Sequence, residues 1–404
     1  MQPRSLVPLL TFAFLFGASS AAAAEHKVTV SAGQFDRRDC VVQFKLPDDT
    51  EAGGYALTDD SGQRTPVQVG PGGRATFILG ELKAGQSRTY TLGEGGGTGW
   101  NKLPAVEMTR DGDRLTFSAA GKEILQYQGA KTPLPEGYDP AFHRGGYIHP
   151  VYAPSGKLVT DDYPPKHKHH HGIWSPWTKT KFEGRSPDFW NMGQKTGTVE
   201  FVDLDAAWGG KVAGGFSARH RMVDLSAEPK PKPAIDETWL VRVYRPLGEE
   251  NPAYVFDWAS TQTCASGSPL VLPKYHYGGF GFRGHRQWEA KDNCFFLTSE
   301  GKDRGNGNET TAKWCWVGGK VDGEMTGVAI LCHPENFRFP QGMRLNPDEP
   351  FFCYCPSQGG DWSIEPGKPY VARYRIVVAD TPADAKEIER LWNDYANPPE
   401  VKVE

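Results

Sequence analysis

Short strand-like runs separated by glycine and proline dominate this chain and favour a β-rich fold. The chain has 47 glycines and 32 prolines among its 404 residues. Between them stand β-branched and aromatic runs, which favour extended backbone, at residues 198–204, 238–244, 254–263, 327–332 and 370–378. Because no internal repeat indicates a propeller, we expect an all-β protein whose main unit is a large β-sandwich.

One helix is expected near the end of the chain. Thr381 is placed to cap it, Pro382 lies in the first turn, and Asp384 completes a capping box. The residues that follow form an apolar stripe at helical spacing, made of Ile388, Leu391, Trp392 and Tyr395. This pattern predicts a helix that packs one face against a sheet.

The first residues resemble a secretory signal peptide. Arg4 precedes an apolar run over residues 6–18, and residues 21–24 supply an A-x-A cleavage site. We therefore predict an exported protein, periplasmic or secreted, without stable membrane insertion. A glycine-rich segment at 93–99 predicts a domain boundary. The expected parts are a signal peptide (1–24), a small β-domain (25–97), a β-sandwich domain that carries the site (98–381), and a helix and tail (382–404).

Charge excludes one class of partner. The formal net charge is only −4, and no basic cluster of the kind that binds nucleic acid is present. The expected partner is therefore a small molecule.

The densest group of reactive side chains is a run of histidines. Four of the eleven histidines lie within five residues, at His167, His169, His170 and His171. If this segment is extended, side chains alternate, so His167, His169 and His171 share one face and predict a metal site for Zn or Cu. His169 and His170 are also candidates for acid and base catalysis, because imidazole titrates near neutral pH.

Other candidates for the same pocket are scattered along the sequence. We predict that His276, Asp188 and Lys274 take part in proton transfer beside His169 and His170. Tryptophan faces bind sugar rings or fill cores, and hydrogen-bonding side chains orient a ligand. The predicted substrate-binding residues are Trp174, Trp190, Arg283 and His149.

Several ordered motifs then carry a resemblance to a known family. They are Gly146 to Tyr152, Asp161 to Pro164, the histidine run, Asp188 to Trp190, Glu237 to Trp239, Leu272 to Gly279, and Pro356 with Ser357. In this order they resemble the bacterial PmoA-like ("methane oxygenase PmoA") family of unknown function over roughly residues 100–380. The family motif H-x-H-H-[RH]-G matches residues 167–172, with Lys168 where proline is frequent.

The resemblance implies a strand-rich exported protein similar to sandwiches of the mutarotase-like (supersandwich) type, with links to sugar catabolism. It does not imply methane oxidation, since a membrane oxygenase subunit needs several spanning helices and this sequence has none beyond the signal.

Three functions remain open on sequence grounds. The first is a hydrolase, lyase or epimerase that acts on a sugar or oligosaccharide by proton transfer through a histidine-rich pocket. The second is a metal-dependent enzyme using Zn or Cu. The third is a glycan-binding module without catalysis. We favour an exported carbohydrate-active enzyme.

Overall fold

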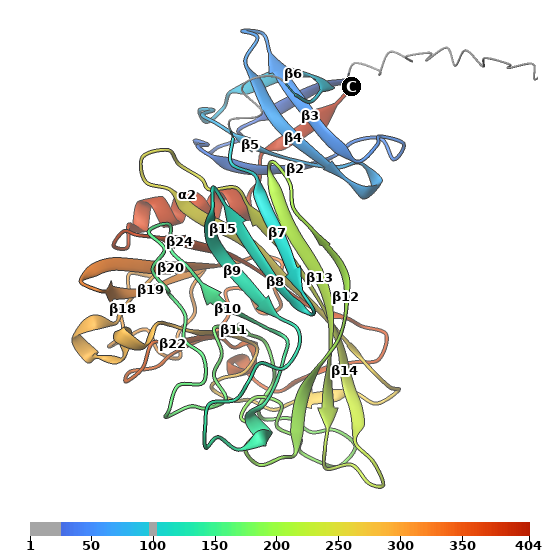
Figure 1. Cartoon of the computed structure of the whole chain (residues 1–404), viewed down its shortest axis with the longest axis vertical. Coiled ribbons are helices and arrows are strands. Elements are labelled where there is room, and N and C mark those ends of the chain that lie inside the picture. Colours follow the sequence, from blue (N-terminus) through green and yellow to red (C-terminus); the bar gives the residue numbers. More distant parts are fainter. Residues whose placement is uncertain (1–25, 97–102) are drawn as a thin grey trace, which may run out of the picture.

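The computed structural model describes residues 26–96 and 103–404, and antiparallel strands make up most of it (Figure 1). The predicted all-β fold is confirmed. The predicted signal peptide, residues 1–24, lies outside the described residues. No helix within the described residues is both long enough and apolar enough to cross a bilayer.

A small seven-stranded sheet forms one end of the molecule. Its strand order is β2-β5-β4-β3-β6-β1-β25. The strands are β1 (His26–Ser31), β2 (Cys40–Lys45), β3 (Gly53–Asp59), β4 (Arg64–Gly70), β5 (Arg74–Leu79), β6 (Ser87–Glu94) and β25 (Glu400–Val403). Apolar side chains alternate along them, so that Val28, Val30 and Phe77 are fully buried in a core of this sheet alone.

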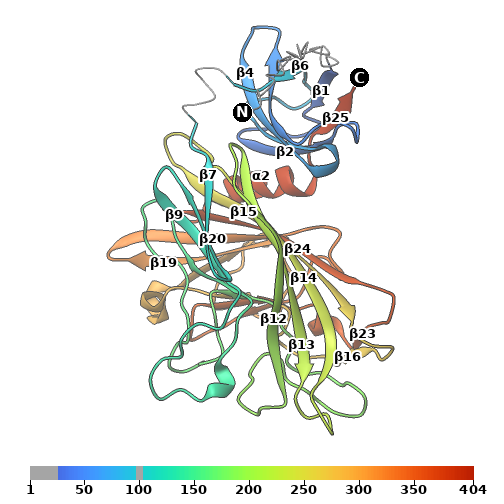
Figure 2. The same ribbon diagram turned by 45° about the vertical axis from the view of Figure 1, so that its right-hand side comes forward.

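The last strand completes this first sheet. β25 pairs with β1, with Val28 opposite Val403 and Val30 opposite Val401, and the carboxyl end therefore lies beside β1 (Figure 2). The segment expected to be a helix and tail, residues 382–404, thus ends in a strand, and nothing local marks a strand that pairs across almost the whole chain.

We expect a chain that ends at residue 399 to lose protection of β1. Its edge would then face water, and the backbone amides that bond to β25 would exchange with deuterium about tenfold faster or more. Hydrogen exchange at residues 27–31 measures this, with β4 as the internal control. Unchanged exchange in β1 would contradict the expectation.

The main body is a sandwich of two eight-stranded sheets. The first has the order β21-β22-β17-β11-β10-β9-β8-β7 and the second β12-β13-β14-β15-β24-β20-β19-β18. The first sheet consists of β7 (Val106–Asp111), β8 (Arg114–Ala119), β9 (Lys122–Gln128), β10 (Tyr147–Val151), β11 (Ile173–Trp174), β17 (Phe280–Arg283), β21 (Met343–Leu345) and β22 (Phe351–Tyr354). The second consists of β12 (Gly197–Trp208), β13 (Ala213–Asp224), β14 (Lys232–Tyr244), β15 (Ala253–Cys264), β18 (Phe295–Thr298), β19 (Trp314–Val321), β20 (Glu324–Cys332) and β24 (Tyr370–Ala379).

One apolar core lies between the two large sheets. Phe117 of β8 stacks on Phe216 of β13 with ring centroids 6.0 Å apart, and Phe280 of β17 contacts Trp258 of β15. These facing rings belong to one buried cluster drawn from both sheets, so the predicted β-sandwich is confirmed. A separate pair, β16 (Leu270–Leu272) and β23 (Trp362–Ile364), lies beside it.

The one α-helix within the described residues, α2 (Ala385–Ala396), lies between the sandwich and the small sheet (Figures 1 and 2). The predicted helix is confirmed, but its cap is Asp384, not Thr381. The Asp384 carboxylate accepts hydrogen bonds from the amides of Lys386 and Glu387, which satisfies two donors at once. A buried ion pair, Arg37 with Asp394 at 3.0 Å, ties the helix to the small sheet.

Candidate functional site

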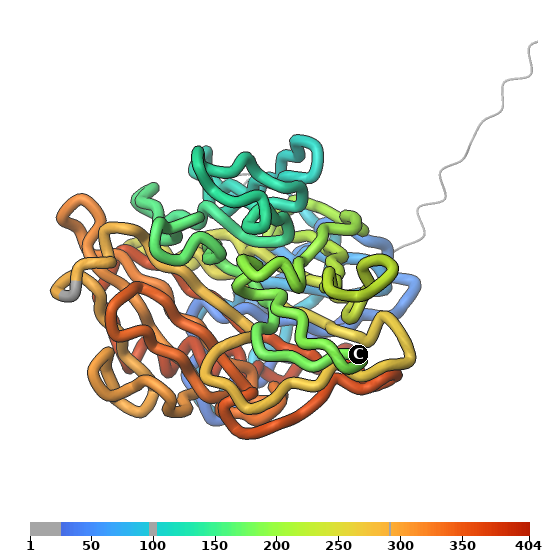
Figure 3. Tube along the Cα trace, turned by 90° about the horizontal axis from the view of Figure 1, so that it is seen from below, coloured from blue at the N-terminus to red at the C-terminus, as the bar shows by residue number. Residues whose placement is uncertain are grey.

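The histidine segment lies between β10 and β11. It belongs to the green loops at the end of the molecule away from the small sheet (Figure 3). It is not extended. The amide of His167 donates to the carbonyl of Pro164 at 3.0 Å, and the amide of His170 donates to that of His167 at 2.8 Å. These are two consecutive turns, so the predicted alternation of side chains is wrong.

The turns bring together histidines that are three residues apart. The rings of His167 and His170 stack with centroids 4.8 Å apart and an angle of 10° between their planes. The His169 ring lies 4.7 Å from that of His170 and nearly perpendicular to it. Residues i and i+3 of a turn lie close in space, which explains why His170, expected on the opposite side, joins His167.

A carboxylate from a distant segment completes the group. Glu349 precedes β22, and its Oε2 lies 2.7 Å from Nδ1 of His167. One ligand atom each from His167, His170 and Glu349 falls within 4.8 Å of the others, an arrangement that could hold a metal ion. Sequence reasoning missed Glu349, because a glutamate before an apolar run carries no local signal of a site.

The donor set therefore differs from the predicted set of His167, His169 and His171. The His169 ring is adjacent but is not part of the converging group. His171 is fully buried, with its Nδ1 2.6 Å from Oδ1 of Asp162 and its ring stacked on Tyr147. These contacts tie His171 to a different polar group.

Two buried imidazole nitrogens of the group lack a hydrogen bond. Nδ1 of His170 has no hydrogen-bond partner among the described residues. Nδ1 of His167 also lacks one, because the nearby Glu349 oxygen lies off the direction that a hydrogen bond requires. Buried polar atoms are nearly always bonded, so atoms left open in this way fit ligands of a cation.

Burial lowers the pKa of two imidazoles, those of His169 and His170. It is the main reason that the pKa of His170 lies well below its usual value, and that the pKa of His169 falls to about 3. Burial alone would raise the pKa of Glu349, but the neighbouring His167 and Arg283 outweigh it and lower that pKa to about 2. A neutral His170 imidazole beside an ionised Glu349 carboxylate has the protonation states that metal coordination needs.

Arg283 forms an ion pair with the Glu349 carboxylate. Its side chain is fully buried and pairs with both Glu349 and Glu289. A guanidinium held by two carboxylates has few donors left for a ligand, so its predicted substrate-binding role is not supported. Its contacts indicate that it positions Glu349.

Aromatic side chains pack against the ring of His170. The His170 ring lies 4.6 Å from Phe351, 5.1 Å from Trp174 and 6.4 Å from Trp190. Trp174 and Trp190 are both 0% exposed, which leaves no free ring face for a sugar. The structure therefore assigns these two tryptophans to the core, against the predicted platform role.

We expect Trp174→Ala to destabilise the protein before it affects any ligand. Removing a fully buried indole leaves a cavity and costs about 3–5 kcal/mol. Chemical denaturation of the variant measures this loss. A normal unfolding midpoint together with weakened ligand binding would contradict the core assignment.

Asp188 and Lys274, both predicted to be catalytic, are not members of the converging group. Asp188 Oδ1 accepts hydrogen bonds from the amides of Trp190 and Asn191, each at 2.9 Å, and so stabilises a turn. Lys274 is exposed, and its amide donates to Asp361.

His276 and His149 have separate surroundings. His276 is half-buried between Tyr275 and Tyr277, and Tyr277 contacts Trp190 with centroids 5.5 Å apart. His276 thus connects to the histidine group only through aromatic neighbours, and one shared pocket stays a prediction. The Nδ1 of His149 lies 2.9 Å from Oγ1 of Thr160, and burial lowers its pKa.

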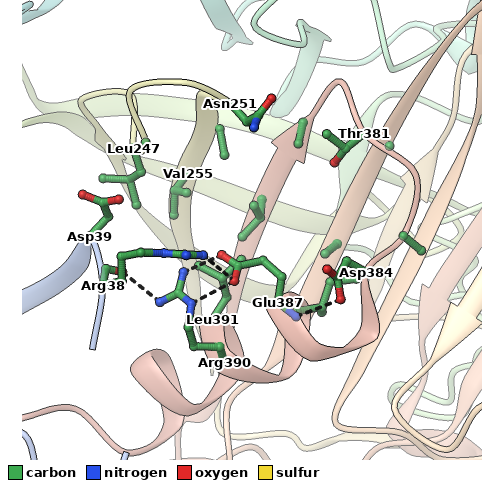
Figure 4. Close-up of a pocket in the computed structure, with 18 of the residues that line it drawn as sticks. Arg38, Asp39, Leu247, Asn251, Val255, Thr381, Asp384, Glu387, Arg390 and Leu391 are labelled. Atoms are coloured by element: carbon green, nitrogen blue, oxygen red, sulfur yellow. Dashed lines mark hydrogen bonds and ion pairs between the residues drawn. The ribbon is translucent and has the colours of Figure 1, made fainter. Parts of the chain in front are cut away.

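A large cavity lies elsewhere, at the junction of the small sheet, α2 and the β14–β15 turn. Its volume is about 1150 Å³. At its rim Arg38 pairs with Glu387 at 2.8 Å, and Arg390 pairs with the same carboxylate (Figure 4). None of the predicted site residues lines this cavity.

The chain matches the model of one protein family. The model of a family of unknown function, DUF6807, matches residues 114–393. No curated protein matches the chain. Among solved structures, a galactose mutarotase related enzyme from Lactobacillus acidophilus is 10% identical, over 69% of this chain and 98% of that chain, with a TM-score of 0.29. A similarity this low carries no argument about function.

Proposed function

The chain belongs to the DUF6807 family of unknown function, and from that premise we propose that it is an exported, divalent-metal-dependent enzyme that acts on a sugar or oligosaccharide. The convergence of His167, His170 and Glu349 carries this proposal. The narrower identification with PmoA-like proteins stays a prediction from the sequence motifs, as does export.

The donor chemistry favours zinc over copper. Two imidazoles and one carboxylate are the protein ligands of many catalytic zinc sites, which leave a fourth position open. An ion held there supplies a Lewis acid that polarises an oxygen atom of the substrate or of water. The carbohydrate part rests on the motif resemblance in the sequence.

Each residue of the group has a distinct role in this proposal. His167 and His170 supply imidazole nitrogen donors, and Glu349 supplies the negative charge. Arg283 keeps Glu349 ionised and oriented, as partners of metal ligands do. His169 is partly exposed at the edge of the group, where its imidazole is placed to hydrogen-bond a substrate hydroxyl.

Proton transfer by histidines alone has weaker support. A general acid needs a pKa near the working pH, whereas burial lowers the pKa of His169 to about 3. Such an imidazole holds no proton to donate near neutral pH. A neutral ring suits a ligand or a hydrogen-bond partner.

Elemental analysis and a turnover screen test the proposal together. We expect about one equivalent of zinc after stripping with chelator and repletion, and turnover of a glycoside or oligosaccharide that chelator removes and zinc restores. Less than about a tenth of an equivalent of any transition metal would overturn the metal site. A metal-loaded protein that converts no sugar in a panel of α- and β-linked substrates would overturn the carbohydrate activity.

A further inference from the structure

The large cavity beside α2, about 1150 Å³ in volume, is a groove on the outer face of the second large sheet (Figure 4). We call it the α2 groove. Its sides are formed by Leu391 of α2 and Leu247 of the β14–β15 turn. Its floor is a row of apolar residues that lie opposite one another on four neighbouring strands, namely Trp316, Ala329, Val377 and Val255. The groove therefore offers an occupant an apolar surface to bury.

The α2 groove is hollow because the next row of the sheet consists of very small residues. Gly327, Ala379 and Ala253 lie opposite one another on β20, β24 and β15, and all three line the groove. The indole of Trp316 covers Gly327 so closely that a Cβ atom on this glycine would come within 2.3 Å of the ring. Larger side chains in this row would fill the space between the sheet, α2 and the β14–β15 turn.

The rim of the α2 groove carries a net negative charge. Six carboxylates and two guanidinium groups line the groove, and both guanidinium groups pair with the carboxylate of Glu387. The exposed side chains of Glu81, Glu249 and Glu250 form no ion pair within the part of the chain that the structure describes. Charge complementarity therefore favours an occupant that brings positive charges on an apolar body.

The carboxylates are spread around the α2 groove and do not converge on one point. Asp39 and Asp384 lie on opposite sides of the floor (Figure 4), Glu81 follows β5, and Glu249 lies between β14 and β15. A peptide with several basic side chains can meet carboxylates on all of these segments, whereas a small cation cannot. The volume of the groove also exceeds the range of about 300–1000 Å³ that is usual for small-molecule pockets.

We propose that the α2 groove docks a peptide segment of a partner protein, with apolar side chains that cover the row from Trp316 to Val255 and lysine or arginine side chains that meet the carboxylates of the rim. None of the residues of the histidine group lines the groove. The docking is therefore independent of the proposed metal-dependent activity.

Fluorescence anisotropy of the full protein with three labelled heptapeptides tests this proposal. The peptide KLLKLLK is basic and apolar, ELLELLE is acidic and apolar, and KSSKSSK is basic without apolar side chains. We expect saturable binding of KLLKLLK, and binding at least about tenfold weaker for each of the other two. The affinity for KLLKLLK should fall as salt is added, because salt screens the exposed carboxylates of the rim.

Two variants locate the binding. Ala329→Leu places a larger side chain on the floor and should weaken the binding of KLLKLLK about tenfold. The double variant Glu249→Gln with Glu250→Gln removes two charges from an exposed turn, where it leaves the fold intact, and should weaken the binding about threefold or more. Asp48→Asn with Asp49→Asn is the matched control, because these adjacent exposed carboxylates do not line the groove, and its affinity should stay native.

Several results would overturn the proposal. They are equal affinity for KLLKLLK and ELLELLE, native affinity in the Glu249→Gln, Glu250→Gln variant, or binding of none of the three peptides. Saturable binding of dodecyltrimethylammonium without binding of KLLKLLK would assign the groove to a small cation instead. A dimer in sedimentation that Ala329→Leu dissociates would assign the groove to a second copy of the chain. Metal content and turnover enter none of these measurements, so failure of this proposal and failure of the proposed function are distinguishable.

Discussion

Replacement of His167 by alanine is expected to abolish metal binding and to reduce turnover by about a hundredfold or more. His167 supplies one of the three converging ligand atoms, and its side chain is 37% exposed, so its removal leaves little void. The variant should fold and melt nearly as the native protein does. Elemental analysis, turnover and melting temperature measured on one preparation test all three statements.

The neighbouring histidines give the controls. His169→Ala removes an imidazole from the same cluster without removing a converging ligand, so it should retain about one equivalent of metal. His170→Ala should lose the metal and also melt earlier, because His170 is only 3% exposed and packs on Trp174 and Phe351. Full metal content and activity in His167→Ala would refute the proposed donor set.

Arg283→Met is expected to cost about 3–5 kcal/mol of folding free energy near neutral pH. The native guanidinium is completely buried between Glu289 and Glu349, and methionine would leave both carboxylates without this partner. Denaturant unfolding measures the loss. Arg219→Met is the matched control: Arg219 also pairs with two carboxylates, Asp203 and Asp205, but is 46% exposed, so its loss should stay below about 1 kcal/mol.

Lowering the pH should reduce the difference in the free energy of unfolding between Arg283→Met and native protein. The pKa of Glu349 is lowered to about 2, so its ionisation stabilises the native fold above the ordinary glutamate pKa of about 4.3. That stability is lost as the pH falls from there toward 2. Unfolding of metal-free protein near pH 7 and near pH 3 tests the sign. If the difference in the free energy of unfolding is larger near pH 3 than near pH 7, the role given to Arg283 is contradicted.

Local patterns in the sequence predict the elements well. Alternating valines at 28 and 30 and the apolar stripe of α2 are visible in the sequence, because side-chain period follows directly from backbone geometry. Thr381 and Asp384 are both capping residues, and only the structure shows which carboxylate or hydroxyl meets the free amides. The helix was therefore predictable, while its first residue was not.

The candidate site was predictable only in part. The histidine run marks the correct segment. Two prolines, at 164 and 165, stand one residue before it, and such a dipeptide favours a turn over extended backbone. A turn at this position places His167 beside His170. Glu349 precedes β22 and Arg283 ends β17, and the long-range pairing of these two strands leaves no mark on either segment.

The pairing of β25 with β1 also sets an order of events during synthesis. Strands β1 to β6 leave the ribosome first, yet their sheet keeps an open edge at β1 until the residues after α2 have emerged. The small sheet is thus begun before the sandwich is made and is completed after it. A binding factor that covers an exposed strand edge would find its target on this nascent chain and lose it once β25 has paired.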